Sequence, residues 1–234
     1  FSQRAQSSEI YQVLFFSTFF LLLTRYLHRP KTTLILGAWA CLAALVLTRL
    51  VFGILLVVPA AMILHAAWTT NPARLDRSRA VVLATLPPLL ILALLAWINH
   101  AKFGSIFLTG YHQWHVEDHR LTTNWIDGVY GFLFSVRWSI FIYFPVLLLA
   151  LPGIKTFVTR HRADAALLFG SFLLLLLTIG SIPSWRGEWT YGPRYLIALL
   201  PGLALPTLYS AELFISLRRS FQRLALGAVL VLLF

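Results

Sequence analysis

The sequence predicts an all-α, polytopic transmembrane helical bundle with about eight membrane segments. Apolar residues make up 59% of the 234 residues, whereas a soluble domain is typically about half apolar. Charged residues are only 12% and gather in clusters separated by apolar runs. Each run has roughly the length that crosses a ~30 Å hydrocarbon core as a helix. The runs are continuous Leu, Ala, Val and Phe without period-two alternation, which favours helices over a barrel.

Eight apolar runs are the predicted membrane segments. They cover residues 10–27, 33–48, 52–68, 81–98, 138–152, 163–182, 195–215 and 224–234. The second and third are short and are separated by Arg49 and its neighbours, so they form either two tight spans or a re-entrant hairpin. Residues 1–234 are expected to be a single transmembrane domain. Because the chain begins at Phe1 and ends inside an apolar run, we expect it to be the C-terminal portion of a longer protein.

The loop charges predict the orientation of the bundle. The alternating loops at residues 25–31, 74–79, 155–162 and 218–223, with their flanks, hold 12 of the 19 basic residues and three of the eight acidic ones. By the positive-inside rule this side is cytoplasmic, which places the N-terminus outside the cytoplasm. The net charge of +11 is thereby explained by membrane topology, so no nucleic-acid partner is expected.

The short outer loop, SWRGEWTYGPRYL, contains the first group of candidate ligand-binding residues. Arg194 begins the next predicted helix, where free N–H groups and a guanidinium would hold an anion such as phosphate. Arg186 and Glu188 flank the loop, and Trp189 and Tyr191 suit a membrane interface. The alternative is an aromatic belt with a snorkelling arginine. We favour ligand binding because charged residues at the membrane edge that are not needed to orient the helices are usually functional.

A second candidate cation is Arg49, at the outer end of the second and third segments. A lone arginine there must face either a polar cavity or the lipid headgroups, and both remain open. The long outer loop at residues 99–137 adds Lys102 and Tyr111.

Histidines and carboxylates also cluster in the long loop. The cluster comprises His112, His115, Glu117, Asp118 and His119. These are metal-ligand types, but their spacing matches no specific zinc signature, so a solvated polar loop is preferred and no metal ligand is assigned. The sequence also contains no P-loop, dinucleotide fingerprint or serine-nucleophile motif.

Several segments occur in a characteristic order: FGSIFLTGY, DGVYGFLFSVRWSIFIYFPVLLLALPG and WRGEWTYGPRYLIALLPGLALP, with LGAWACLAALVLTRLVFGILLVVPA before them. This set resembles bacterial GT-C glycosyltransferases of the protein O-mannosyltransferase or lipopolysaccharide-sugar-transferase type. The resemblance extends over about residues 10–206. One departure is WRGEW, where a Trp-Gly-Gly-Trp-like run is expected, which makes the roles of Arg186 and Glu188 less secure than that of Arg194.

The resemblance implies a membrane glycosyltransferase of the bacterial cell envelope, multi-pass in the inner membrane. It would transfer a hexose or pentose from a polyprenyl-phosphate donor to an extracytoplasmic acceptor. The donor phosphate would bind Arg194, Arg186, Arg49 and Lys102, and the substrate would contact Glu188, Trp189, Tyr191 and Tyr111. A divalent metal is a possible cofactor, and lipid-linked sugar and membrane lipids are the partners. The catalytic acid is expected upstream of this chain, because Glu9 lies too late in the order to be assigned that role.

An alternative function is a transporter or flippase of a lipid-linked anion. Transporters commonly have internal repeats and place charges at broken helices near the bilayer midplane. Here no repeat is visible and the charges gather at the outer face, which favours the enzyme. The pair Pro87 and Pro88, which could break a span, keeps the alternative open.

Overall fold

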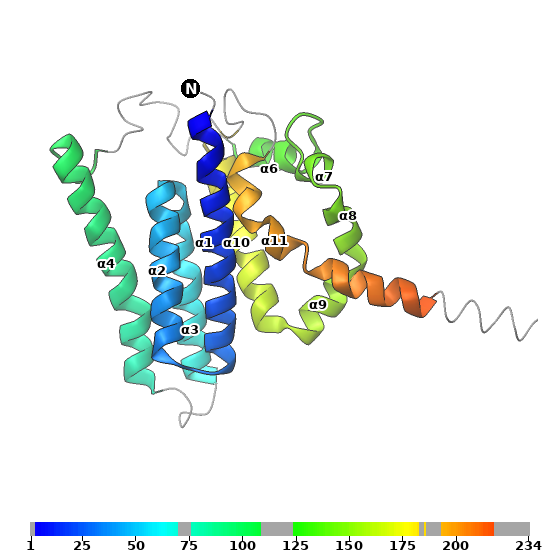
Figure 1. Cartoon of the computed structure of the whole chain (residues 1–234), viewed down its shortest axis with the longest axis horizontal. Coiled ribbons are helices and arrows are strands. Elements are labelled where there is room, and N and C mark those ends of the chain that lie inside the picture. The colour runs from blue at the N-terminus through cyan, green and yellow to red at the C-terminus, as the bar shows by residue number, and fades with distance from the viewer. Residues whose placement is uncertain (1–2, 70–75, 109–123, 183–184, 186–192, 218–234) are drawn as a thin grey trace, which may run out of the picture.

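In the computed structural model, the described residues are 3–69, 76–108, 124–182, 185 and 193–217, with side chains from Ser8 onwards. This part of the chain is helical and contains no strand, as the sequence predicts (Figure 1). The last predicted segment, residues 224–234, lies outside the described residues.

The first half is a set of antiparallel helices. They are α1 (Gln3–His28), α2 (Thr32–Thr48), η1 (Leu50–Leu56), α3 (Val57–Thr69) and α4 (Arg77–Phe103). Helix α1 packs mainly against α2, and α3 packs against α4 (Figure 1). Helices α1, α2, α3 and α4 run in alternating directions (Figure 1).

Helix α1 presents one continuous buried stripe. Its members are Gln12, Phe16, Phe19, Leu23 and Tyr26, all at most 2% exposed. Their spacing of four and three residues places them on one face of a helix. The stripe packs against α2 and η4, so the apolar pattern determines which side of α1 faces the protein.

Helix α4 lies at the edge of this group and keeps an apolar outer surface. Asp76 caps its start by accepting a hydrogen bond from the Ser78 N–H at 3.1 Å, and Gly104, with φ of 74°, ends it. Along the outer face Leu89 and Leu90 are about 60% exposed. Such a surface is expected where a helix faces lipid.

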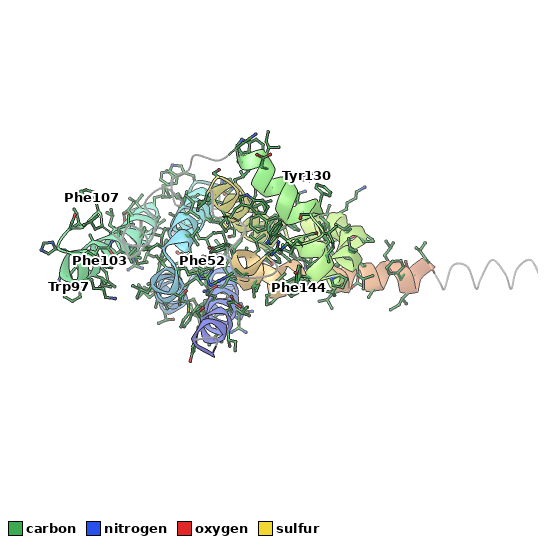
Figure 2. The ribbon with its side chains drawn as sticks, turned by 90° about the horizontal axis from the view of Figure 1, so that it is seen from above. Phe52, Trp97, Phe103, Phe107, Tyr130 and Phe144 are labelled. Carbon is green, nitrogen blue, oxygen red and sulfur yellow. The ribbon has the colours of Figure 1, made fainter. Side chains whose placement is uncertain are left out.

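Large aromatic side chains extend from the far end of α4. Figure 2 shows Trp97, Phe103 and Phe107 together there, whereas Phe52 lies inside the bundle. Trp97 is 66% and Phe107 is 81% exposed, and Phe52 is fully buried. Aromatic residues at the end of a membrane helix are typical of the membrane–water interface.

The second half begins with α6 (Trp125–Phe134), which packs on α10 (Arg162–Gly180). Between them the chain descends in short pieces: α7 (Ile140–Tyr143), α8 (Val146–Ala150), η2 (Leu151–Gly153) and α9 (Ile154–Arg160) (Figure 1). After α10 come η4 (Arg194–Leu199), α11 (Leu200–Leu203) and the helix Pro206–Leu217.

Four described helices are long and apolar enough to cross a membrane. They are Ser8–His28, Leu50–Thr69, Arg77–Phe103 and Arg162–Gly180. Segments Arg194–Leu203 and Pro206–Leu217, bent by 45°, would form a fifth as one broken span. Thr32–Thr48 is apolar but has only 17 residues.

The predicted segment at residues 138–152 is not a continuous helix. Ser139 caps α7 through the Phe141 N–H, and Pro145 and Pro152 lack the N–H groups that continuous α-helical pairing needs. The segment is apolar, as predicted, but it forms the short helices α7, α8 and η2 in place of one continuous helix.

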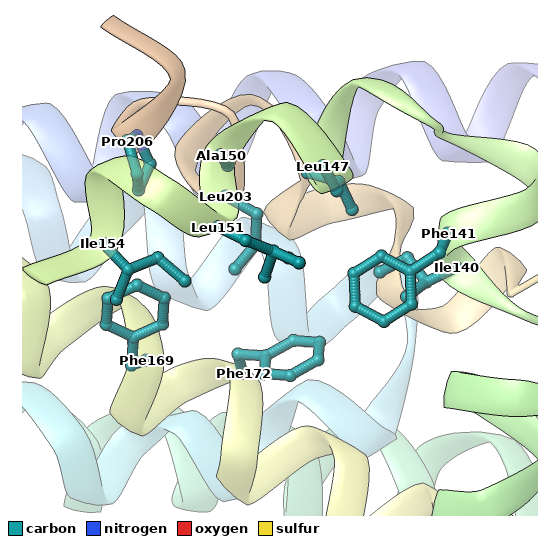
Figure 3. Close-up of a pocket in the computed structure, with 10 residues that line it drawn as sticks. All are labelled: Ile140, Phe141, Leu147, Ala150, Leu151, Ile154, Phe169, Phe172, Leu203 and Pro206. Carbon is teal, nitrogen blue, oxygen red and sulfur yellow. The ribbon is translucent and has the colours of Figure 1, made fainter. Parts of the chain in front are cut away.

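An apolar pocket lies beside this broken segment. It holds about 110 Å³ of open volume between α7–α9 on one side and α10–α11 on the other (Figure 3). Phe141, Leu151, Phe169, Phe172 and Leu203 line it together with other apolar residues.

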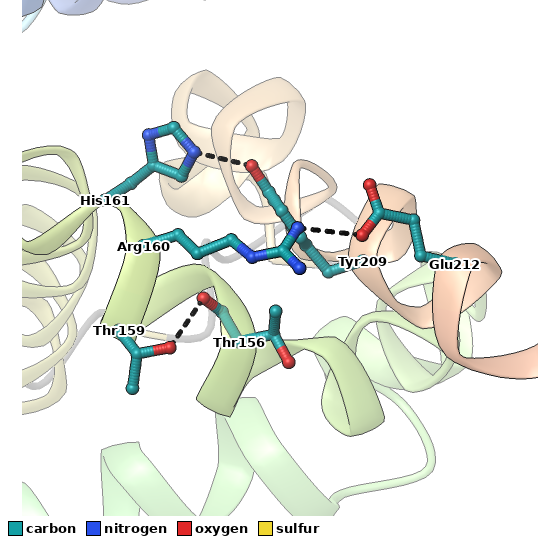
Figure 4. Close-up of polar contacts among 6 residues, drawn as sticks. All are labelled: Thr156, Thr159, Arg160, His161, Tyr209 and Glu212. Atoms are coloured by element: carbon teal, nitrogen blue, oxygen red, sulfur yellow. Dashed lines mark hydrogen bonds and ion pairs between the residues drawn. The ribbon is translucent and has the colours of Figure 1, made fainter. Parts of the chain in front are cut away.

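Polar contacts join the helix Pro206–Leu217 to the junction of α9 and α10 (Figure 4). The Tyr209 hydroxyl lies 2.6 Å from His161 Nε2, and His161 Nδ1 lies 3.5 Å from Asp164 Oδ2. Nearby, Arg160 Nη1 donates to Glu212 Oε2 at 2.9 Å. These contacts hold the last described helix against the preceding hairpin.

Candidate anion-binding site

One carboxylate joins three parts of the chain that are distant in sequence. Glu9 Oε1, on α1, lies 3.9 Å from Arg49 Nη2 and 3.5 Å from Arg194 Nε. Arg49 follows α2, and Arg194 begins η4. The candidate site is therefore assembled where α1 begins, from α1, the α2–η1 junction and η4.

Arg49 is held in place by its backbone. It interrupts the helical path with extended angles, φ −154° and ψ 126°, while its N–H still bonds Leu45 O. The side chain is only 9% exposed, and its Cζ lies 5.1 Å from the centre of the Tyr195 ring. An arginine this deeply buried needs compensating partners, and the Glu9 carboxylate and the aromatic ring are two of them.

Arg194 supplies the second guanidinium group of the site. Its side chain is 23% exposed, and its Cζ lies 5.9 Å from the centre of the Tyr195 ring. Both guanidinium groups thus lie within cation–π range of one ring. The predicted helix start is a six-residue 3₁₀ segment, so the positive potential here comes chiefly from guanidinium charge.

Gln12 adds an unsatisfied amide next to the charges. It lies three residues after Glu9, on the same face of α1, and is fully buried. Within the described part of the chain, neither Gln12 Nε2 nor Oε1 has a hydrogen-bond partner. Leaving such a group unpaired costs about 1–3 kcal/mol, so a fully buried amide one helical turn from Glu9 favours a polar ligand or water at this position.

Two guanidinium groups lie near one carboxylate in this group of three side chains. The two Glu9 distances exceed the roughly 2.7–2.9 Å of a charge-assisted hydrogen bond, and Arg194 Nε has no hydrogen bond within the described structure. The Arg194 Nε–H is therefore a donor from which an anionic ligand could accept a hydrogen bond.

The structure brings together only some of the residues chosen from the sequence. Arg49 and Arg194 meet, whereas Lys102 is an exposed residue in the last turn of α4, a helix that packs on α3 and α2. Five other choices lie outside the described residues: Arg186, Glu188, Trp189, Tyr191 and Tyr111.

Sequence reasoning missed Gln12 and left Glu9 without a role. The sequence could have indicated that both residues face the protein interior, because Glu9 and Gln12 continue the three- and four-residue spacing of the buried α1 stripe. Polar residues in register with an apolar stripe point into the protein, where they need partners.

No cluster of three or more histidine, cysteine or carboxylate groups suited to a metal occurs in the portion of the chain that was described. The loop cluster His112–His119 falls outside that portion. Comparison with known proteins found no matching family model, no matching curated protein and no matching solved structure.

Proposed function

We propose that the chain belongs to a multi-pass membrane glycosyltransferase that moves a sugar from a polyprenyl-phosphate donor to an acceptor outside the cytoplasm. The observation that carries the proposal is the convergence of Arg49 and Arg194 on Glu9 beside the unpaired amide of Gln12. The motif resemblance to GT-C enzymes supplies the reaction class and the bacterial inner membrane as its location.

The site fits the phosphate of a membrane-bound donor. Two guanidinium groups provide the planar donors that phosphate oxygens prefer. Arg49 directly precedes the candidate span Leu50–Thr69, and Arg194 begins the bent pair Arg194–Leu203 and Pro206–Leu217, so an amphiphile could place its phosphate here and its hydrocarbon chain in lipid.

The proposed reaction defines what the arginines would do. The acceptor hydroxyl oxygen bonds to the anomeric carbon, the bond from that carbon to the phosphate oxygen breaks, and the electron pair leaves with the polyprenyl phosphate. The hydroxyl proton passes to a base that we do not assign. Arg49 and Arg194 would stabilise the negative charge that develops on the leaving phosphate.

The test uses the full-length protein in nanodiscs with a panel of polyprenyl-phosphate sugars. We expect Arg49→Ala and Arg194→Ala each to reduce release of polyprenyl phosphate by about 10- to 100-fold, the loss of one charged hydrogen-bonding group. Arg79→Ala is the matched control, because Arg79 is an exposed arginine in the first turn of α4. Unchanged turnover in both site variants would overturn the assignment.

A flippase for a lipid-linked anion is the second candidate. The 45° bend between Arg194–Leu203 and Pro206–Leu217 favours it, because transporters often build ion sites from broken helices. In proteoliposomes carrying fluorescent polyprenyl phosphate, the enzyme predicts sugar release without faster transbilayer movement. Movement that depends on Arg194, without sugar release, would instead identify a flippase.

A further inference from the structure

The position of Glu9 has a consequence for which phosphates the site can hold. Its carboxylate lies against both arginines at the place where an anionic ligand would bind. The carboxylate is 27% exposed at the side-chain level, so the interaction is only partly screened by solvent. Any phosphate bound by the two guanidinium groups would therefore lie beside a fixed negative charge.

Resting on the proposed function, we propose that Glu9 is a specificity-determining residue that favours phosphodiesters over phosphomonoesters. A polyprenyl-phosphate sugar is a phosphodiester and carries one negative charge. The product, polyprenyl phosphate, is a monoester that carries about 1.5–2 negative charges near neutral pH. Glu9 thus favours the donor over the product.

Coulomb repulsion from Glu9 supports this discrimination, because its carboxylate lies within 3.9 Å of both guanidinium groups that would hold the phosphate. Because Coulomb repulsion is proportional to charge, Glu9 raises the free energy of the bound dianion about twice as much as that of the bound monoanion.

Gln12 is a second polar group, near Glu9, with which a ligand could form hydrogen bonds. Its amide is fully buried, unpaired within the described structure and one helical turn from Glu9. The amide is neutral, so it can donate to either type of phosphate. Discrimination by charge is consequently left to Glu9.

The experiment measures the affinity of the full-length protein in neutral-lipid nanodiscs for two probes. One is polyprenyl monophosphate and the other is its methyl ester, a phosphodiester. Measurements at about pH 8 keep the monoester dianionic, since its second pKa is about 6. If Glu9→Gln tightens diester binding by about 3-fold, it should tighten monoester binding by roughly 10-fold, the square of that factor.

Two variants serve as controls. Glu9→Asp keeps the charge and should keep the preference for the diester. Glu212→Gln removes the same charge from the exposed pair with Arg160, at the other end of the bundle, and should change neither affinity. Equal changes for the two probes in Glu9→Gln, or weaker binding of both, would overturn the role of Glu9.

A different result would contradict the proposed function itself. In that case Arg49→Ala and Arg194→Ala would leave the affinities for both probes unchanged. If both arginines are required but Glu9→Gln leaves the ratio of the two affinities unchanged, the phosphate site stands and the specificity role is refuted.

Discussion

The Trp39 indole Nε1 on α2 donates a hydrogen bond of 2.9 Å to the Leu83 carbonyl on α4. In a regular helix that carbonyl would accept from the N–H of residue 87, but Pro87 has none. The indole therefore satisfies an acceptor that the proline leaves unpaired, and it joins two helices.

We expect Trp39→Phe to lower unfolding stability by about 1–2 kcal/mol, because it removes the donor and leaves the Leu83 carbonyl unpaired. Thermal unfolding in detergent measures the effect. Trp97→Phe, at an exposed position on α4, is the control and should change little. In a Pro87→Ala background the helix supplies its own donor, so the same cost for Trp39→Phe in that background would argue against this account.

The contact between α6 and α10 depends on glycine. A Cβ at Gly128 would overlap the backbone of Gly180, so α6 must move away to accept it. Gly128→Ala is expected to lower the midpoint of thermal unfolding by several degrees. Gly170→Ala is the matched control, because Gly170 is also helical and a Cβ there meets nothing within 4 Å. That variant should be neutral or slightly stabilising.

Substitution of Gln12 should have opposite effects on the stability of the protein and on ligand binding. Gln12→Leu replaces an unpaired buried amide by an apolar group of similar size, so we expect stability to rise by about 1 kcal/mol and affinity for polyprenyl monophosphate to fall. Thr24→Val removes another unpaired buried polar atom from the same helix, away from the site. It should stabilise without weakening binding. A Gln12→Leu variant that keeps full affinity would show that the amide does not contact the ligand.

The two contacts that hold the helix Pro206–Leu217 should differ in strength. Tyr209→Phe removes the part-buried hydrogen bond to His161 and is expected to cost about 1 kcal/mol. Glu212→Gln breaks a pair whose side chains are 57% and 59% exposed, and it should cost less than about 0.5 kcal/mol. Thermal unfolding of the two single variants compares them, and a larger loss for Glu212→Gln would reverse this ranking.

The orientation predicted from loop charge can be tested by cysteine labelling in a Cys41→Ala background. Ile126→Cys lies at an exposed position in the first turn of α6, and Thr159→Cys lies at an exposed position in α9. With the basic loops cytoplasmic, an impermeant thiol reagent added to intact cells should label residue 126 and not residue 159. Labelling of residue 159 alone would invert the predicted topology.

Sequence composition predicted the long helices well, because a run of apolar residues at helical length directly reflects what lipid requires. It failed at residues 138–152. An apolar composition indicates that a segment is surrounded by lipid or protein, but it does not show whether the helix is unbroken. Here Ser139, Pro145 and Pro152 divide the helix. Arg49 and Arg194 were recognised as isolated charges beside apolar runs. Their common partner Glu9 was not, because only the packing of α1 against α2 and η4 brings the three together.

The long sequence separation within the Glu9–Arg49–Arg194 group also affects biosynthesis. Arg194 follows Arg49 by 145 residues, which a ribosome adds in roughly 7–30 s. During that interval Arg49 would already lie at the membrane, while Tyr195 of η4, whose ring it contacts, does not yet exist. Glu9, synthesised earlier, is an acidic partner that can pair with Arg49 throughout this period. The same carboxylate can thus shield a charge in the growing chain before it takes its place beside Arg194.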